Sequence, residues 1–204
     1  MDKKVWWNRA ESIPVKDSNF QKILNFYLFN CPVVYTQKRN KKVIKKAVSE
    51  RAKTFIDQGW EGYAIPTLLS EMKNCAYNLN YKPLNKNVLI DNSFLQKEEI
   101  QAGEMIFFLE RDDMGDMYAI YYGIRNAFAH GSFSVVKQQS EMVYYLQSAK
   151  EGVTKSAMRL RERTLLKWIE LFYSTTDDLA KIKKERKNAN NRARKKRERM
   201  SGAA

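Results

Sequence analysis

The sequence has one histidine, and an arginine and an asparagine lie close before it. Arg125, Asn126 and His130 fall within a stretch of six residues in the chain of 204. An imidazole can accept or donate a proton near neutral pH, and a planar guanidinium can hold a phosphate through two N–H groups. Because Asn126 and His130 are four residues apart, a helix would place the amide beside the imidazole. This group can therefore bind an anion and transfer protons, although a lone histidine before Gly131 can also serve only as a helix cap.

The helix that would position these groups is expected over residues 117 to 129. Arg125 is the only formally charged side chain between residues 117 and 136. At 100° per residue, the large apolar side chains form one stripe, comprising Met117, Ile120, Tyr121, Ile124, Ala127 and Phe128. The opposite face is also uncharged, and small residues there would allow a second helix to approach. We therefore predict that a second subunit covers it, with a dimer interface of Tyr118, Ala119, Tyr122 and Gly123.

The run Arg125-Asn126-Ala127-Phe128-Ala129-His130 resembles the signature of HEPN domains. In that family an arginine and a polar residue precede a histidine by four to six positions on a late helix of a helical bundle. The context is similar to that of small HEPN proteins that carry strands before their last helix, because Gly131 and a candidate hairpin follow the motif. The resemblance covers roughly residues 17 to 175.

The resemblance implies metal-independent cleavage of RNA by a homodimer, with Arg125, Asn126 and His130 as the catalytic residues. The histidine would take the proton of a ribose 2′-hydroxyl, and the arginine would stabilise the phosphate. The products would carry a 2′,3′-cyclic phosphate and a 5′-hydroxyl. A toxin or an antiphage defence effector fits this activity, with an antitoxin or defence protein as a possible partner. A noncatalytic HEPN module that binds nucleic acid or a partner protein is the alternative.

Metal and cofactor chemistry find little support in the composition. One histidine and two cysteines, Cys31 and Cys75, cannot supply a structural zinc site. Asp112, Asp113 and Asp116 are the kind of ligand that Mg²⁺ prefers, but acidic residues are also common at a helix start. We therefore expect no metal and no cofactor.

Two segments carry the net charge of +14. Residues 181 to 199 have a net charge of +9 and residues 38 to 53 have +7, so the rest of the chain has −2. A nearly neutral body with two basic segments indicates contact with a polyanion, although charge runs can also merely solvate a surface. The predicted RNA-binding residues are Lys38, Arg39, Lys41, Lys42, Lys45, Lys46, Lys183, Lys184, Arg186, Lys187, Arg192, Arg194, Lys195, Lys196 and Arg197.

A membrane partner is not expected. The basic tail carries almost no Trp, Phe or Leu, and no apolar run reaches the length of a membrane span. The first residues lack the apolar stretch of a secretory signal, so a cytoplasmic location is predicted.

The periodicity predicts a mainly α fold, a HEPN-like helical bundle with a small β insertion before its last core helix. Helices are expected over residues 17 to 31, 43 to 56, 66 to 79 and 165 to 172, with an interrupted helical stretch over 93 to 109. Residues 80 to 92 are expected to form a loop. Residues 132 to 136 and 142 to 146 read as a hairpin, and 156 to 161 as a third strand. The domain is predicted to span residues 1–179. Residues 180–204 are predicted to form a basic helix or tail with no apolar docking face.

Overall fold

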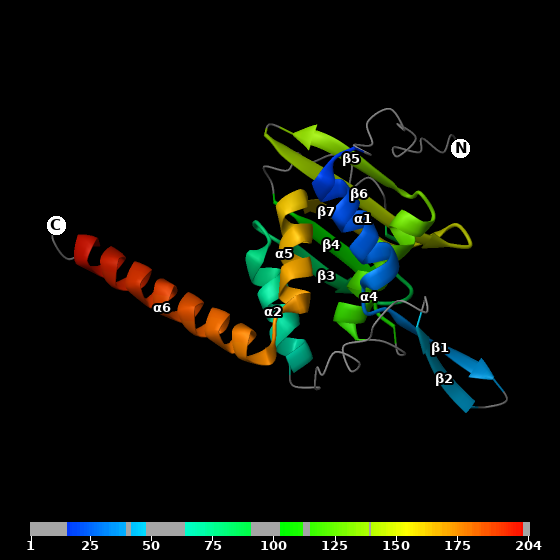
Figure 1. The fold of residues 1–204 in the computed structure, drawn as a ribbon, viewed down its shortest axis with the longest axis horizontal. Helices are drawn as coiled ribbons and strands as arrows, with labels where there is room; N and C mark the ends of the chain where they lie inside the picture. Colours follow the sequence, from blue (N-terminus) through cyan, green and yellow to red (C-terminus); the bar gives the residue numbers. More distant parts are fainter. Residues whose placement is uncertain are drawn as a thin grey trace.

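The computed structural model describes residues 16–39, 42–47, 64–90, 103–111, 115–138 and 140–201. Within these ranges, helices pack on one face of a five-stranded mixed sheet, and a separate two-stranded hairpin projects from the body (Figure 1). The expected mainly α bundle is wrong, because the sheet runs through the whole body and is not an insertion. The fold is α/β.

The five-stranded sheet contains both parallel and antiparallel strand pairs. The strands are β3 (Asn80–Leu84), β4 (Met105–Leu109), β5 (Phe133–Gln138), β6 (Glu141–Lys150) and β7 (Val153–Arg161), in the order β3-β4-β7-β6-β5. Strands β5, β6 and β7 form an antiparallel meander, which confirms the predicted hairpin and third strand. Strand β4 then pairs antiparallel with β7 and parallel with β3. The carboxyl ends of β3 and β4 therefore meet at one edge of the sheet.

Strands β3 and β4 overturn two predictions. The apolar run of β4 was expected to be helical, but all five of its residues are buried in the sheet. A short run that is apolar on every side has no period that separates a buried strand from a buried helix. The segment of β3 was expected to be a loop because it contains Asn80 and Pro83, yet an edge strand tolerates proline.

A second correction concerns residues 43 to 56, for which a helix was predicted. Residues 34–39 and 42–47 instead form the antiparallel strands β1 (Val34–Arg39) and β2 (Lys42–Ala47), in a register that pairs Gln37 with Ile44. The spacing of Val43, Ile44 and Ala47 fits a helix, but β-branched residues also favour a strand, and pairing with β1 decides between them. The rest of the predicted helix, residues 48 to 56, lies outside the described residues.

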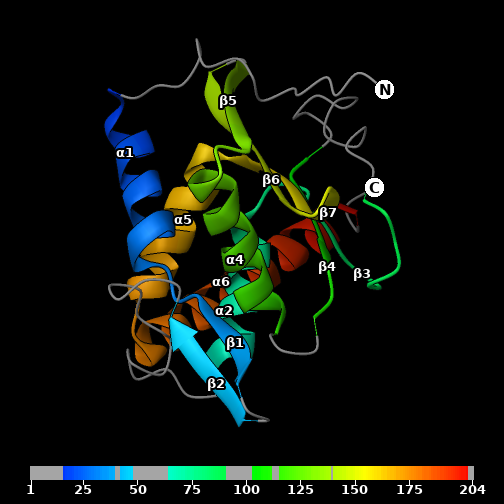
Figure 2. The ribbon, with the colours of Figure 1, turned by 90° about the vertical axis from the view of Figure 1, so that its right-hand side faces the viewer.

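The predicted helices around residues 17 to 31, 66 to 79, 117 to 129 and 165 to 172 are confirmed. They are α1 (Ser18–Asn25) with its π-helical continuation η2 (Phe26–Asn30), α2 (Ala64–Cys75), α4 (Asp116–Ala129) and α5 (Glu162–Tyr173). Figure 2 shows α1, α4 and α5 on the same side of the sheet. Buried hydrogen bonds tie the helices together: the Trp168 indole on α5 donates to Met72 O on α2 at 3.0 Å, and the Tyr27 hydroxyl on η2 donates to Leu165 O on α5 at 3.1 Å. Both cysteines are free.

Helix α6 (Thr176–Ser201) follows α5 and extends away from the body (Figure 1). Its first turns are anchored, because Leu179 is buried, Ile182 packs against the core and Arg186 pairs with the buried Glu71 at 2.6 Å. The prediction that residues beyond Asp178 have no docking face is therefore wrong for the start of this helix, and the predicted boundary at residue 179 falls inside it. In the described part of the chain, no helix combines the length and apolar character that crossing a membrane requires.

Helix α4 lies directly on the sheet at Gly123. A Cβ atom at this position would lie 2.5 Å from Ser156 Oγ and 3.2 Å from Ser156 Cβ. We expect Gly123→Val to lower the free energy of unfolding by about 1–3 kcal/mol, because the added atoms would push α4 away from β7. Chemical denaturation would measure this loss, with Ala129→Val, at an exposed site on the same helix, as the control for the β-branched side chain. Equal stability of the two variants would contradict this packing.

Candidate nucleic-acid site

Arg125 and Asn126 are linked to each other and to the sheet near the end of α4. Arg125 Nη1 donates to Asn126 Oδ1 at 3.4 Å, and Asn126 Nδ2 donates to Ser148 Oγ on β6 at 3.4 Å. These long bonds set the direction of the amide group, with its oxygen toward the arginine and its nitrogen toward the strand. Asn126 is thus held between α4 and β6.

Arg125 carries a positive charge that no described carboxylate balances. It forms no ion pair in the described part of the chain, and its Nε is buried without a hydrogen-bond partner. Burial raises the pKa of the nearby Cys31 thiol to about 12, while the charge of Arg125 acts in the opposite direction. A cation that is partly buried without a counter-ion is suited to hold an anion such as a phosphate.

His130 is the residue at which α4 ends. Its backbone has φ −102° and ψ 6°, and Gly131 follows in the left-handed region with φ 63°. The last carbonyls of the helix accept main-chain hydrogen bonds, from Gly131 N to Phe128 O at 3.2 Å and from Ser132 N to Ala127 O at 2.8 Å. This is the pattern of a Schellman motif.

The Schellman motif argues against a role of His130 as a helix cap. Because the main chain already satisfies these carbonyls, the imidazole is not needed to cap them. The side chain is exposed and forms no hydrogen bond with the residues that the structure describes. His130 is therefore free to meet a ligand at the same end of α4 as Arg125 and Asn126.

The uncharged second face of α4 was predicted to pack against a second subunit, but part of it packs against the sheet of the same chain. Ala119 is buried, and Gly123 faces Ser156 and Met158 of β7 in the same chain. Gly123 therefore approaches the sheet of its own chain and not a second subunit, which corrects its predicted place in a dimer interface. Tyr118 and Tyr122 are partly exposed, and their place in a dimer stays a prediction.

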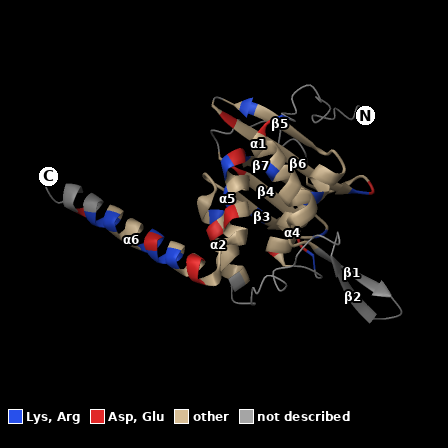
Figure 3. Cartoon of the chain, in the orientation of Figure 1, with Lys and Arg blue, Asp and Glu red and all other residues tan. Residues whose placement is uncertain are grey.

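The basic residues divide between two elements that point away from each other (Figure 1). Figure 3 shows Lys and Arg recurring along α6. It carries Lys183, Lys184, Arg186, Lys187, Arg192, Arg194, Lys195, Lys196 and Arg197. Lys38, Arg39, Lys42, Lys45 and Lys46 lie on the β1–β2 hairpin, and Lys41 lies outside the described residues. Figures 1 and 2 place this hairpin at the end of the body where α4 begins, so the structure does not bring it to His130.

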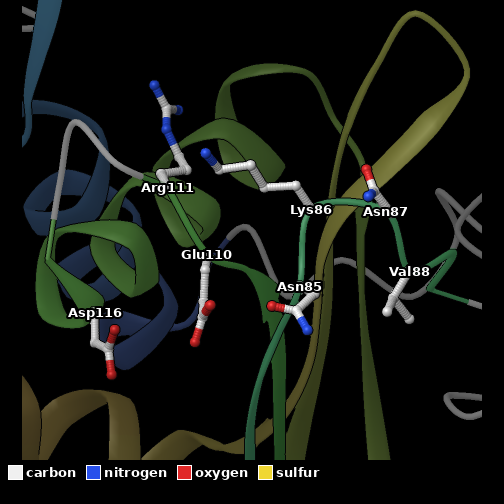
Figure 4. Close-up of a pocket in the computed structure, with 7 residues that line it drawn as sticks. All are labelled: Asn85, Lys86, Asn87, Val88, Glu110, Arg111 and Asp116. Atoms are coloured by element: carbon white, nitrogen blue, oxygen red, sulfur yellow. The ribbon is translucent and has the colours of Figure 1, made fainter.

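Sequence reasoning missed a cleft of about 750 Å³ where β3 and β4 end and α4 begins (Figure 4). Its lining residues are Asn85, Lys86, Asn87, Val88, Glu110, Arg111 and Asp116. The sequence pattern predicts no such cleft, because it indicates a loop for the segment of β3 and a helix for that of β4. Two parallel strands that end side by side would have been the signal.

One wall of this cleft is fixed by a tyrosine and a carboxylate. The Tyr81 hydroxyl donates to Asp116 Oδ2 at 2.6 Å, and Lys73 Nζ lies 3.4 Å from the centre of the Tyr81 ring. Burial, together with this hydrogen bond to Asp116, raises the pKa of Tyr81. Burial lowers the pKa of Lys73, while the charge of Asp116 acts in the opposite direction. Asp116 therefore serves this contact at the start of α4, and no cluster of three or more metal-ligating side chains occurs among the described residues.

Comparisons of this chain with protein-family models, curated proteins and solved structures give no match. The interpretation of the site therefore depends on the chemistry and geometry of its own residues.

Proposed function

We propose that this protein is a metal-independent endoribonuclease whose catalytic residues are Arg125, Asn126 and His130. The observation that supports this most is the end of α4, where an exposed imidazole that no cap requires lies within two turns of an arginine without a counter-ion. Because the fold is α/β, a helical bundle does not support this proposal. The proposal accordingly rests on these three side chains and on the basic helix α6.

Each residue has a role that its surroundings allow. His130 takes the proton of a ribose 2′-hydroxyl, whose oxygen attacks the adjacent phosphorus while the 5′-oxygen leaves with a proton. Arg125 binds the phosphate oxygens as their charge grows, and Asn126 orients the RNA or the imidazole. A 2′,3′-cyclic phosphate and a 5′-hydroxyl result. In a homodimer, the second copy of His130 would supply the proton for the leaving oxygen.

Affinity for RNA would come from α6. Beyond Arg186 the described side chains of this helix are exposed, and cations outnumber carboxylates along it. Each lysine or arginine that contacts a phosphate releases a counter-ion, so binding should weaken steeply as salt rises. We place the protein in the cytoplasm, as a toxin or antiphage effector that a cognate antitoxin or defence partner restrains.

A noncatalytic RNA-binding module is the second candidate function. The separation of α6 from the body favours it, because this helix can bind a polyanion without any contribution from His130. The two functions differ in one result: only the first leaves RNA cut.

The test is incubation of the purified full chain with total RNA in excess EDTA, followed by mapping of the fragment ends. The proposal predicts fragments with 5′-hydroxyl ends and 2′,3′-cyclic phosphates. Bound but intact RNA would support the noncatalytic module, and fragments that disappear with EDTA would reject the metal-independent mechanism.

A further inference from the structure

The cleft at the carboxyl ends of β3 and β4 separates opposite charges. In Figure 4 the side chains of Lys86 and Arg111 lie on one side, and the carboxylates of Glu110 and Asp116 point to the other. The side chain of Asn85 lies on the acidic side as well. A volume of about 750 Å³ is in the usual range for small-molecule sites. A ligand that fills both sides needs an anionic group at one end and hydrogen-bond donors at the other.

A nucleotide combines these features, because it carries an anionic phosphate at one end and N–H donors on its base at the other. The carboxylates of the cleft then determine which base fits. Asp116 is already engaged by Tyr81, whereas the Glu110 carboxylate forms no hydrogen bond or ion pair with described residues. A carboxylate accepts two parallel hydrogen bonds most favourably. Guanine is the RNA base whose Watson–Crick edge offers two adjacent N–H donors, at N1 and N2, to such an acceptor. Adenine, cytosine and uracil each offer one donor group there.

We propose that this cleft binds a guanylate, with Glu110 accepting from the base edge and Lys86 and Arg111 contacting the phosphate. As a specificity site for RNA, it rests on the proposed function. Glu110 is the specificity-determining residue, because phosphate contacts are the same for every base.

Arg111 connects this cleft to α4, the helix that carries the candidate catalytic residues. The Arg111 guanidinium lies 5.1 Å from the centre of the Tyr122 ring, and Tyr122 is one helical turn before Asn126. Ten residues separate Asp116 from Asn126, which corresponds to about 15 Å along a helix axis. Stacked nucleotides rise roughly 3.4 Å each, so the guanosine would lie about four nucleotides from the bond that is cut.

The experiment measures the affinity of short fluorescent RNAs for the full chain carrying His130→Ala, which keeps the RNA intact. The oligomers contain one guanosine, replaced in turn by inosine, which lacks the N2 amine, and by adenosine. We expect the guanosine oligomer to bind about 10-fold more tightly than the adenosine oligomer, with inosine in between. Glu110→Gln should abolish this preference without changing the affinity for the adenosine oligomer.

Glu151→Gln is the matched control, since Glu151 is an exposed carboxylate at the turn between β6 and β7. It should keep the full preference for guanosine. Equal affinities for all oligomers, no RNA binding, or an equal loss of preference in both glutamine variants would overturn the role of the cleft as a specificity site for RNA. A further arm adds free 5′-GMP and 5′-AMP: a Glu110-dependent preference for GMP without one for the oligomers would assign the cleft to a free guanylate, and no preference in either arm would overturn guanylate binding altogether. The binding measurement uses His130→Ala, which does not cut RNA. The preference for guanosine can therefore be measured even if the wild-type protein does not cleave RNA.

Discussion

His130→Ala is expected to lower the rate of RNA cleavage in excess EDTA by about 10²–10⁴-fold, with the affinity for RNA unchanged. The loss follows from removing the group that takes the 2′-hydroxyl proton. The fold should be unaffected, because the imidazole is exposed and main-chain groups of Gly131 and Ser132 close the helix. Single-turnover cleavage of a defined RNA, together with its binding curve and a thermal melt, would measure the three quantities.

The arginine provides an independent check of the same site. Arg125→Lys keeps the charge but removes the planar pair of donors, so it should slow cleavage more than it weakens binding. Arg163→Lys is the control, because Arg163 is an exposed arginine that pairs with Glu141 at 3.0 Å on another part of the surface. Full activity of both His130→Ala and Arg125→Lys would mean that the cleavage comes from a different site.

Removal of the outer part of α6 is the second prediction with a large expected effect. A chain that ends after Lys187 loses six of the Lys and Arg residues but keeps Leu179, Ile182 and Arg186, which anchor the helix. We expect its RNA affinity at low salt to fall by at least about 10-fold. The slope of log Kobs against log salt should decrease by up to about 4, since each phosphate contact with a single strand contributes roughly 0.7.

A chain that ends after Arg199 is the matched control, because it retains all six of these cations. Its affinity and salt slope should equal those of the full chain. If the shorter chain binds RNA with an unchanged salt slope, α6 does not hold the phosphates. Truncation after Asp178 would be a poor substitute, because it removes the buried Leu179 and leaves the buried carboxylate of Glu71 without Arg186.

The sequence predicted the second half of the molecule well. Helix α4, the strands β5 to β7 and helix α5 follow one another with clear changes of period, from helical spacing to alternation and back. Gly131 marked the end of α4, and its left-handed backbone explains why glycine is found there. The order of elements around the candidate site could therefore be read from local pattern alone.

The first half of the sheet could not be read in this way. The run Met105–Leu109 is apolar at every position, and the segment of β3 contains Asn80 and Pro83, so neither has the alternation of a half-buried strand. Their pairing joins residues about 25 apart in parallel and then residues about 50 apart in antiparallel. Such distant contacts decide the structure, and local period does not report them.

The second face of α4 shows the same limit for the candidate site. Its lack of charge indicated a covered face, and Ala119 and Gly123 are indeed enclosed, whereas His130 on the same face is exposed. At Gly123 the cover is β7, which lies more than 30 residues later in the chain, and not a second subunit. A sequence identifies a buried face but not the element that buries it.

The central claim is that the end of α4 cleaves RNA by attack of the 2′-hydroxyl. The most direct measurement compares an RNA that the protein cuts at a mapped bond with the same RNA carrying one 2′-deoxynucleotide on the 5′ side of that bond, in excess EDTA. The account predicts that the deoxy substitution abolishes cleavage at that bond while binding is unchanged. Cleavage of both RNAs at the same rate would show that water, and not the 2′-hydroxyl, attacks the phosphorus, and would contradict the account.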